Sequence, residues 1–104
     1  MIYMAGIDYT RASIAQREQF SFVAGQVTML LEKLYRHPLI DGCVLLATCN
    51  RTELYVSAQE NVLVAERLCE AAGVPYAASI FRSECGEAAE RYLMEVASGL
   101  HSQI

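Results

Sequence analysis

The spacing of apolar positions along the chain predicts both strands and helices. Residues 2–9 alternate loosely and carry two Ile and two Tyr, which favours a strand. Residues 43–47 form a continuous apolar run, typical of a strand buried on both faces. Residues 53–58 alternate between polar and apolar positions, as a half-exposed strand does, and a further short strand is predicted within residues 76–82.

Three segments carry the spacing of an amphipathic helix. Apolar side chains recur every three or four positions over residues 17–37, with Ser21 as the candidate N-cap. Residues 61–72 repeat the pattern, and so do residues 84–98, where Ser83 is the expected N-cap.

The order of these elements is strand, helix, strand, strand, helix, strand, helix. This order is that of a ferredoxin-like split βαβ domain, an α+β fold in which the helices cover one face of the sheet. The last helix is then an addition at the C-terminal end. A length of 104 residues fits one such domain, spanning residues 1–104.

Composition and charge narrow the classes of function. Hydrophobic residues make up 54% of the chain and charged residues 19%, which is typical of a folded domain. A net charge of −4 argues against a free-standing nucleic-acid binder, because the phosphate backbone favours clustered Lys and Arg. The first residues carry no basic leader, and no apolar run approaches a membrane span, so we expect a soluble, cytoplasmic protein with no membrane partner. Four cysteines without a Cys-x-x-Cys pair, and only two histidines, give no zinc-site pattern.

Residues 48–52, which read Thr-Cys-Asn-Arg-Thr, lie between two predicted strands and carry candidate chemistry. A nucleophilic cysteine needs partial exposure and nearby positive charge or hydrogen-bond donors. Arg51 offers the charge to Cys49, and Thr48 and Asn50 offer donors; Arg51 is equally suited to bidentate binding of a substrate carboxylate. The alternative is that this segment is only a turn, with Cys49 as a half-buried spacer.

These residues also carry a resemblance to a known family. Residues 45–55, Leu-Leu-Ala-Thr-Cys-Asn-Arg-Thr-Glu-Leu-Tyr, resemble the glutamyl-tRNA reductase signature, whose usual form contains Ser-Thr-Cys-Asn-Arg-Thr-Glu. Residues 6–9 (Gly-Ile-Asp-Tyr) followed by Arg17-Glu18 resemble the opening strand and first helix of the family. Residues 96–100 (Val-Ala-Ser-Gly-Leu) with Ser102 resemble its Val-Ala-Ser-Gly-Leu-Asp-Ser segment. The chain is therefore identified as similar to the N-terminal catalytic domain of that family over essentially its whole length.

The resemblance implies a reaction and a role for each matched residue. The cysteine at position 49 would attack the ester of glutamyl-tRNA, giving a glutamyl thioester and free tRNA. NADPH would then reduce the thioester to glutamate-1-semialdehyde, the first step of tetrapyrrole (porphyrin) biosynthesis. Thr48, Asn50 and Arg51 would line the glutamate pocket, with Arg51 holding the side-chain carboxylate, and Ser102 would hydrogen-bond the substrate.

The resemblance also implies parts that these 104 residues do not supply. Family members continue into an NADPH-binding domain and a helical dimerisation region, and the chain contains no Gly-x-Gly-x-x-Gly fingerprint for a dinucleotide. We therefore expect a fragment that transfers the acyl group without reducing it. The expected partners of the full protein are glutamyl-tRNA, a second copy of itself and glutamate-1-semialdehyde aminomutase.

The chain departs from the family pattern at several positions. Tyr92 stands at the usual histidine of the family, Asp8-Tyr9 replaces Asn-His, and His101 replaces an aspartate. Tyr92 is a candidate catalytic residue that can donate a hydrogen bond, but a phenol is a poor proton acceptor at neutral pH.

Three alternatives remain open at the level of sequence. The departures are compatible with an impaired or non-catalytic homologue that serves as a binding or regulatory module. A ferredoxin-like small-molecule-binding domain unrelated to the reductase is the second alternative. A thiol-redox site is the third, and it requires Cys43 to approach Cys49 within disulfide reach.

Overall fold

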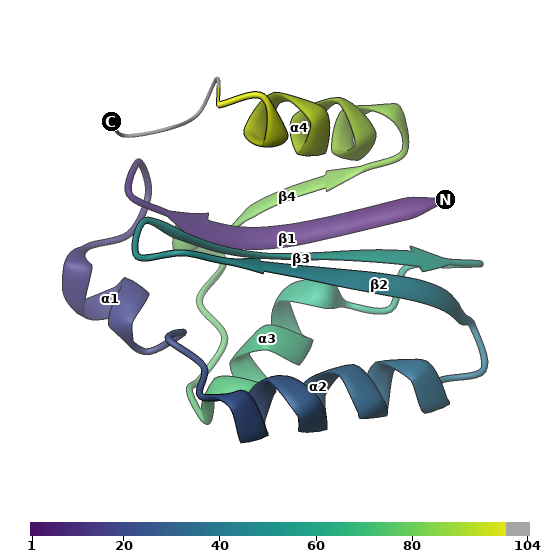
Figure 1. The fold of residues 1–104 in the computed structure, drawn as a ribbon, viewed down its shortest axis with the longest axis horizontal. Helices are drawn as coiled ribbons and strands as arrows, with labels where there is room; N and C mark the ends of the chain where they lie inside the picture. Colours follow the sequence, from purple (N-terminus) through teal and green to yellow (C-terminus); the bar gives the residue numbers. More distant parts are fainter. Residues whose placement is uncertain (100–104) are drawn as a thin grey trace.

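The computed structural model of the chain describes residues 1–99, which form a four-stranded sheet with helices on both faces (Figure 1). The elements follow in the order β1 (Ile2–Asp8), α1 (Ile14–Glu18), α2 (Ala24–Arg36), β2 (Ile40–Ala47), β3 (Arg51–Ala58), α3 (Val64–Ala72), the 3-10 helix η1 (Ala78–Ile80), β4 (Arg82–Cys85) and α4 (Glu87–Ala97). Within the described residues, no helix is both long enough and apolar enough to cross a membrane.

The sheet has the strand order β2-β3-β1-β4, and every neighbouring pair is antiparallel. Strands β2 and β3 form a hairpin, whereas β1 reaches β2, and β3 reaches β4, through helical connections that each pass over one intervening strand. This connectivity is the split βαβ arrangement, so the α+β fold class expected from the sequence is confirmed.

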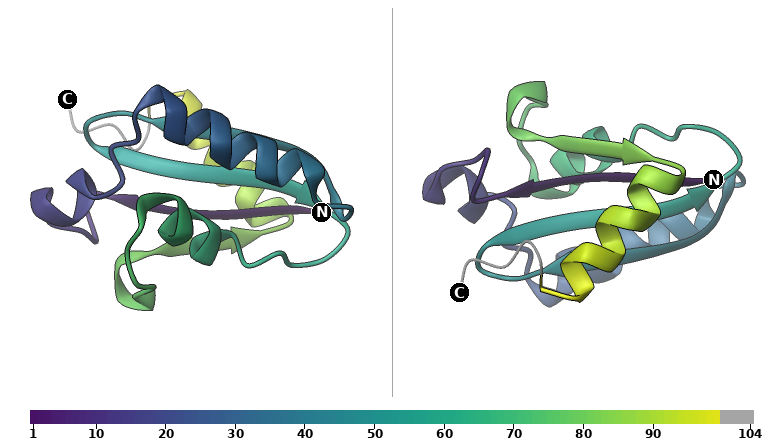
Figure 2. Two further views of the ribbon diagram at one scale, coloured as in Figure 1. Left: turned by 90° about the horizontal axis from the view of Figure 1, so that it is seen from below. Right: turned by 90° about the horizontal axis from the view of Figure 1, so that it is seen from above.

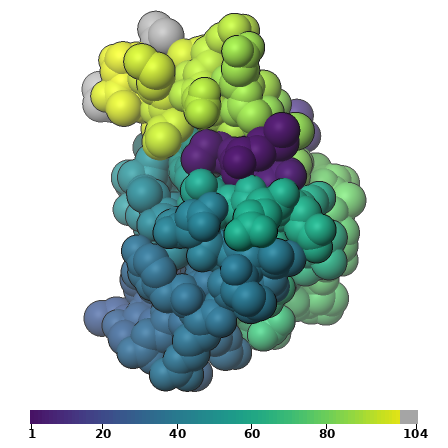
Figure 3. Space-filling view, turned by 90° about the vertical axis from the view of Figure 1, so that its right-hand side faces the viewer, coloured from purple at the N-terminus to yellow at the C-terminus, as the bar shows by residue number. Residues whose placement is uncertain are grey.

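The two faces of the sheet are covered differently. Helices α2 and α3 contact each other on one face, and α4 crosses the opposite face, as views from below and above show (Figure 2). In a space-filling view the strands lie between α4 at the top and α2 at the bottom (Figure 3). The helix added at the C-terminal end therefore closes the face that α2 and α3 leave open.

Most of the hydrophobic core lies between the sheet and the α2/α3 pair. Because side chains alternate across a strand, every second residue of β1 and β3 points to this side. Among them, Ala5, Ile7, Leu54 and Val56 are at most 1% exposed. The buried apolar set beneath α4 is smaller and consists of Met4, Tyr55, Ala89 and Tyr92. The α4 side of the sheet therefore has space for buried polar side chains.

The predicted burial of the two hairpin strands is wrong in both cases. The apolar run of residues 43–47 belongs to β2, which is an edge strand of this sheet and leaves Val44 49% exposed. The alternating strand β3 was expected to be half-exposed, but it is central, and only Ser57 among its eight residues is not buried. Arg51 and Glu53 of β3 thus face α4 instead of water.

The single helix predicted over residues 17–37 is two helices. Helix α1 ends at Glu18 and α2 begins at Ala24, with Phe20 buried in the break at 1% exposure. Its ring packs edge-on against Phe81 at 5.7 Å, and its carbonyl accepts a hydrogen bond from Thr52 Oγ1 at 3.2 Å. Ser21 is not a cap; Ser13 caps α1 instead, in a capping box with Gln16.

The C-terminal elements begin later than the sequence predicts. Residues 82–85 pair with β1, so the predicted strand over residues 76–82 lies too early, and η1 occupies most of its place. Ser83 lies inside β4 and caps nothing, since α4 starts at Glu87 after Gly86, whose φ is +61°. Helix α3 likewise starts at Val64, three residues later than expected.

Candidate active site

Cys49 lies at the tip of the tight turn that joins β2 to β3, and its side chain is exposed. Thr48 closes the turn, because its N–H donates to Arg51 O at 2.8 Å and its Oγ1 accepts from Asn50 N–H at 3.2 Å. The Tyr9 N–H donates to Asn50 O at 3.1 Å and so ties the turn to the end of β1. The backbone around the thiol is therefore fixed while the sulfur itself faces solvent.

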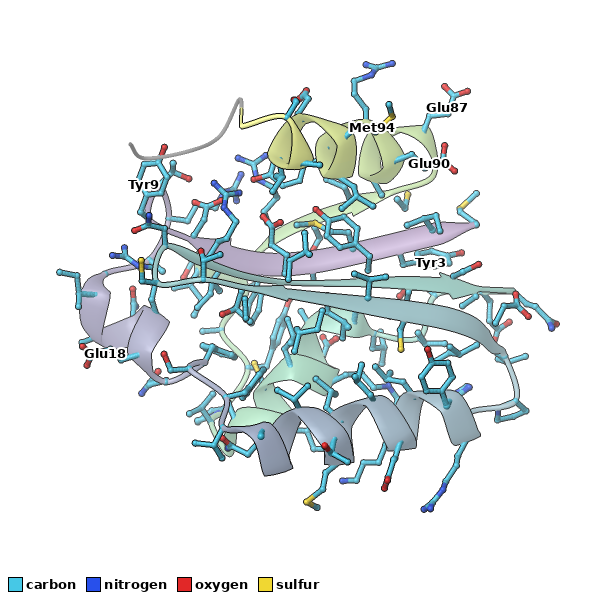
Figure 4. The ribbon with its side chains drawn as sticks, viewed as in Figure 1. Tyr3, Tyr9, Glu18, Glu87, Glu90 and Met94 are labelled. Atoms are coloured by element: carbon cyan, nitrogen blue, oxygen red, sulfur yellow. The ribbon has the colours of Figure 1, made fainter. Side chains whose placement is uncertain are left out.

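A cleft of about 390 Å³ opens beside this turn. Its lining residues come from α1, the segment after it, and the β2–β3 turn, and they are Ile14, Arg17, Glu18, Ser21, Thr48, Cys49, Arg51 and Thr52. Glu18 and Tyr9 both lie at the end of the sheet where β2 turns into β3 (Figure 4). The exposed thiol thus borders a cavity large enough for a small acyl group.

Arg51 is the first residue of β3, and its guanidinium lies on the α4 side of the sheet. Its Nη1 donates to Glu53 Oε2 at 3.1 Å and to the Tyr92 hydroxyl at 3.3 Å, and the residue is 7% exposed. Burial alone lowers the pKa of Arg51, but the contacts with Tyr92 and the charge of Glu53 outweigh it and raise that pKa. Arg51 therefore carries a fixed positive charge that Glu53 already faces.

Tyr92 connects Arg51 to the end of β1. Its hydroxyl accepts from Arg51 Nη1 and donates to Asp8 Oδ2 at 3.3 Å, while the Arg82 guanidinium lies 4.8 Å from the centre of its ring. Burial and the negative charge of Glu53 raise the pKa of Tyr92. Tyr92 therefore remains protonated at neutral pH, where it can donate a hydrogen bond but cannot accept a proton.

Asp8 is 2% exposed and is held by its neighbour Thr10. The Thr10 N–H donates to Asp8 Oδ1 at 2.8 Å, and the Thr10 hydroxyl donates to the same oxygen. Burial alone would raise the pKa of Asp8, but the two bonds from Thr10 and the charges of Arg51 and Arg82 lower it. The buried, ionised carboxylate of Asp8 thus lies close to the Arg51 guanidinium.

A family model described as the N-terminal domain of glutamyl-tRNA(Glu) reductase matches residues 5–104 of the chain. The chain belongs to this family. It is 40% identical to the glutamyl-tRNA reductase of Alkaliphilus oremlandii over 108 residues, which cover 99% of the chain and 32% of that relative. It is 38% identical to the probable multifunctional siroheme biosynthesis protein HemA of Ruminiclostridium josui, with 99% of the chain and 21% of that protein covered.

The fold agrees with a solved member of the reductase family. The glutamyl-tRNA reductase from Methanopyrus kandleri superimposes with a TM-score of 0.70 at 28% identity, over 98% of the chain and 23% of that structure. The reductase of Acetivibrio thermocellus is also 40% identical to the chain, and the chain spans about a third of the length of this relative and of the Alkaliphilus oremlandii reductase.

This reductase domain brings some of its expected site residues together and separates others. Thr48, Cys49 and Arg51 line one cleft, and Asn50 completes the turn beside them. Tyr92 contacts Arg51 and Asp8, so it belongs to the polar group beneath α4. Ser102 and His101 lie outside the described residues.

The other members of that polar group in the reductase domain are not among the site residues predicted from the sequence. Glu53 is 1% exposed, and its Oε1 accepts from the Tyr55 hydroxyl at 3.1 Å. Burial and the charge of Glu53 raise the pKa of Tyr55. The signal was present, because the period-2 spacing of Arg51, Glu53 and Tyr55 places all three on one face of β3. Over residues 1–99 no three His, Cys, Asp or Glu side chains gather closely enough to hold a metal ion.

The positions of Cys43 and Cys49 do not support a thiol-redox site. Cys43 lies within β2, and the extended strand from there to Ala47 spans roughly 13 Å before the turn begins. Cys49 lies beyond that point, whereas a disulfide requires Cα atoms within about 7 Å. Burial also raises the pKa of Cys43, which makes its thiolate less available.

Gly6 makes room for Glu53, and replacing it should disturb the reductase domain. A Cβ at position 6 would lie 2.6 Å from Glu53 Cγ and 2.8 Å from the Thr52 carbonyl oxygen, which is backbone and cannot move aside. We expect Gly6→Ala to lower the free energy of unfolding by about 3 kcal/mol, measured by urea denaturation. Gly42→Ala is the matched control, because a Cβ there meets no atom within 4 Å. Equal stability of the two variants would contradict the packing described here.

Proposed function

We propose that this chain is the substrate-handling domain of a glutamyl-tRNA reductase and that Cys49 takes the glutamyl group from glutamyl-tRNA. The observation that carries the proposal is an exposed thiol on a rigid turn, beside a cleft that Arg51 also lines, in a chain of this family. The names of the relatives support the same reaction, since two of them are glutamyl-tRNA reductases.

The chemical step is an acyl transfer to sulfur. The Cys49 thiolate attacks the carbonyl carbon of the glutamyl ester, so an S–C bond forms and the C–O bond to the terminal ribose breaks. The ribose oxygen leaves with a proton, which gives free tRNA and a glutamyl thioester on Cys49. A thioester is a better hydride acceptor than an oxygen ester, so the covalent step divides one difficult reaction into two.

The neighbouring side chains position the acyl group. Arg51 binds the side-chain carboxylate of the glutamyl group in this proposal, and Thr48 and Asn50 bound the pocket around the reacting carbon. Tyr92 holds the guanidinium through its hydroxyl, which is a positioning role in place of the usual histidine of the family. Ser102 is proposed as a further hydrogen-bonding partner of the substrate.

The residues of this chain do not fit NADPH. The chain has no Gly-x-Gly-x-x-Gly segment for a dinucleotide phosphate. We propose that NADPH binds in the part of the full-length protein that this chain does not include, and that it there supplies the hydride that releases glutamate-1-semialdehyde. A homodimer, a contact with glutamate-1-semialdehyde aminomutase and a cytoplasmic location are part of the same proposal.

The proposal is tested by looking for the acyl group on the protein. Incubation with glutamyl-tRNA is expected to add the mass of one glutamyl residue to the peptide that contains Cys49, and hydroxylamine should remove it. Cys85 is an internal control, because it is also exposed but lies at the end of β4. An adduct on Cys85, or none on either cysteine, would overturn the assignment.

A non-catalytic binding module is the second candidate, and one observation favours it: Glu53 already occupies the guanidinium that should bind the substrate. The two candidates differ in the reactivity of the thiols. A catalytic Cys49 should alkylate with iodoacetamide faster than Cys85, as measured by mass spectrometry over time, whereas a binding module predicts equal rates.

A further inference from the structure

Two buried carboxylates that the acyl transfer does not use lie beside Arg51, and one of them has a consequence for substrate choice. Asp8 is the residue directly opposite Arg51 in the pairing of β1 with β3, on the same face of the sheet. Glu53 lies two positions along β3 and bonds Arg51 directly. The inference below rests on the proposed use of Arg51 as the group that binds an anionic side chain.

The positive charge of Arg51 is already offset by carboxylates before any substrate arrives. Glu53 and Asp8 flank Arg51, the latter through the Tyr92 hydroxyl. Arg82 Nε lies 3.9 Å from Asp8 Oδ2, and its Nη1 lies 3.7 Å from Glu84 Oε1. Among the described residues, three carboxylates therefore face two guanidiniums, so no positive charge is in excess.

We propose that Asp8 is a specificity-determining residue that weakens the preference of the Arg51 site for an anionic acyl side chain. An incoming carboxylate meets the negative charge of Asp8 as well as the positive charge of Arg51, and the buried setting screens neither of them well. Thr10 holds the Asp8 carboxylate in place with two hydrogen bonds, so it cannot turn away into solvent. An uncharged isostere such as a glutaminyl group escapes this repulsion.

The role of Asp8 can be tested by a substitution that disturbs the fold little, whereas a substitution of Glu53 would disturb it more. An asparagine at position 8 keeps the oxygen that accepts both bonds from Thr10 and removes the charge, while its NH2 group replaces the oxygen that accepts from the Tyr92 hydroxyl. Glu53 packs against Gly6 and bonds both Arg51 and Tyr55, so its replacement would change the packing as well.

The experiment compares one tRNA charged either with glutamate or with glutamine. The rate of deacylation gives kcat/KM for each, and their ratio measures how strongly the site selects the anionic side chain. In the wild-type protein this ratio is expected to be small, below about a hundredfold, because carboxylates already offset the positive charge of Arg51. Asp8→Asn should raise the ratio by about tenfold, chiefly through a lower KM for the glutamyl substrate.

The controls separate charge at Asp8 from other effects. Glu84→Gln removes the third carboxylate, which is half-buried and forms its ion pair with Arg82, so the ratio should change less than about twofold. Asp8→Ser repeats the test with a shorter neutral side chain, and its ratio should rise with that of Asp8→Asn.

Each outcome decides between the two proposals. A wild-type ratio of several thousand, or a ratio that neither Asp8 variant changes, overturns the role of Asp8 and leaves acyl transfer standing. An equal rise of the ratio in the Glu84→Gln variant also overturns the role of Asp8, because the effect would then not depend on proximity to Arg51. If the wild-type protein deacylates neither tRNA, the proposed function itself fails.

Discussion

Replacing Cys49 by serine is expected to slow the deacylation of glutamyl-tRNA by about three orders of magnitude. A hydroxyl at this position is a far weaker nucleophile than a thiolate. The measurement is the rate at which labelled glutamate leaves the tRNA in the presence of the protein, corrected for spontaneous hydrolysis.

The same substitution should leave the fold intact. Cys49 is exposed, and the bonds that close the turn involve the backbone and Thr48, so serine removes no buried contact. The thermal midpoint should therefore shift by less than about 1 °C. Cys85→Ser is the matched control, since it removes another exposed thiol and should keep the full rate. Equal deacylation by the wild-type protein and Cys49→Ser would remove Cys49 from the mechanism.

Removing the guanidinium beneath α4 is expected to have the largest effect on stability. Arg51→Met leaves Glu53, whose side chain is 1% exposed, with the Tyr55 hydroxyl in place of its charged partner. Breaking a buried ion pair from one side costs about 3–5 kcal/mol of the free energy of unfolding. For a domain of this size that is a large part of the total, so much of the variant should be unfolded at 37 °C.

A double-mutant cycle isolates the contribution of the pair. Arg51→Met combined with Glu53→Gln leaves no unpaired buried charge, so we expect the double variant to lose at least about 1.5 kcal/mol less than the sum of the single variants. Lys33→Met is the control, because its pair with Glu70 is 61% and 64% exposed and should contribute less than about 1 kcal/mol. Additive losses at Arg51 and Glu53 would show that the two side chains do not interact as the distances indicate.

The order of the elements could be predicted from the sequence, but the position of each strand in the sheet could not. The period of the apolar pattern distinguishes strand from helix locally, and that was enough for the split βαβ arrangement. Whether a strand is central or at an edge depends on how distant strands pair. The apolar residues of β2 therefore suggested burial, although β2 has a neighbour on one side only.

The predicted helix boundaries were wrong for a related reason. The three- and four-residue spacing continues from Phe20 to Val23 and Val27 across a break in which the chain turns to bury Phe20 against Phe81. No local propensity marks that contact, since its partner lies 61 positions away in the sequence. Ser13, by contrast, forms a capping box with Gln16, a signal that the sequence did contain.

One part of the candidate site could be predicted from the sequence, and the other part could not. Turn chemistry and the cysteine identified the segment around Cys49, because those signals are local. The polar group beneath α4 was missed because the alternation of residues 53–58 predicts a half-exposed strand, in which the polar side chain of Glu53 would face solvent. A glycine in the interior of β1 was the available clue, since Gly6 in a strand marks a close approach of other atoms.

The polar lining beneath α4 also bears on how the molecule comes apart. Helix α2 packs on apolar side chains, whose exposure to water costs free energy. Helix α4 instead covers a small apolar set together with Asp8, Arg51 and Glu53. Hydration of these charged groups compensates part of the cost of lifting α4 from the sheet. Local opening at this helix therefore requires less free energy than global unfolding, and the polar group can become wet while the opposite face stays closed.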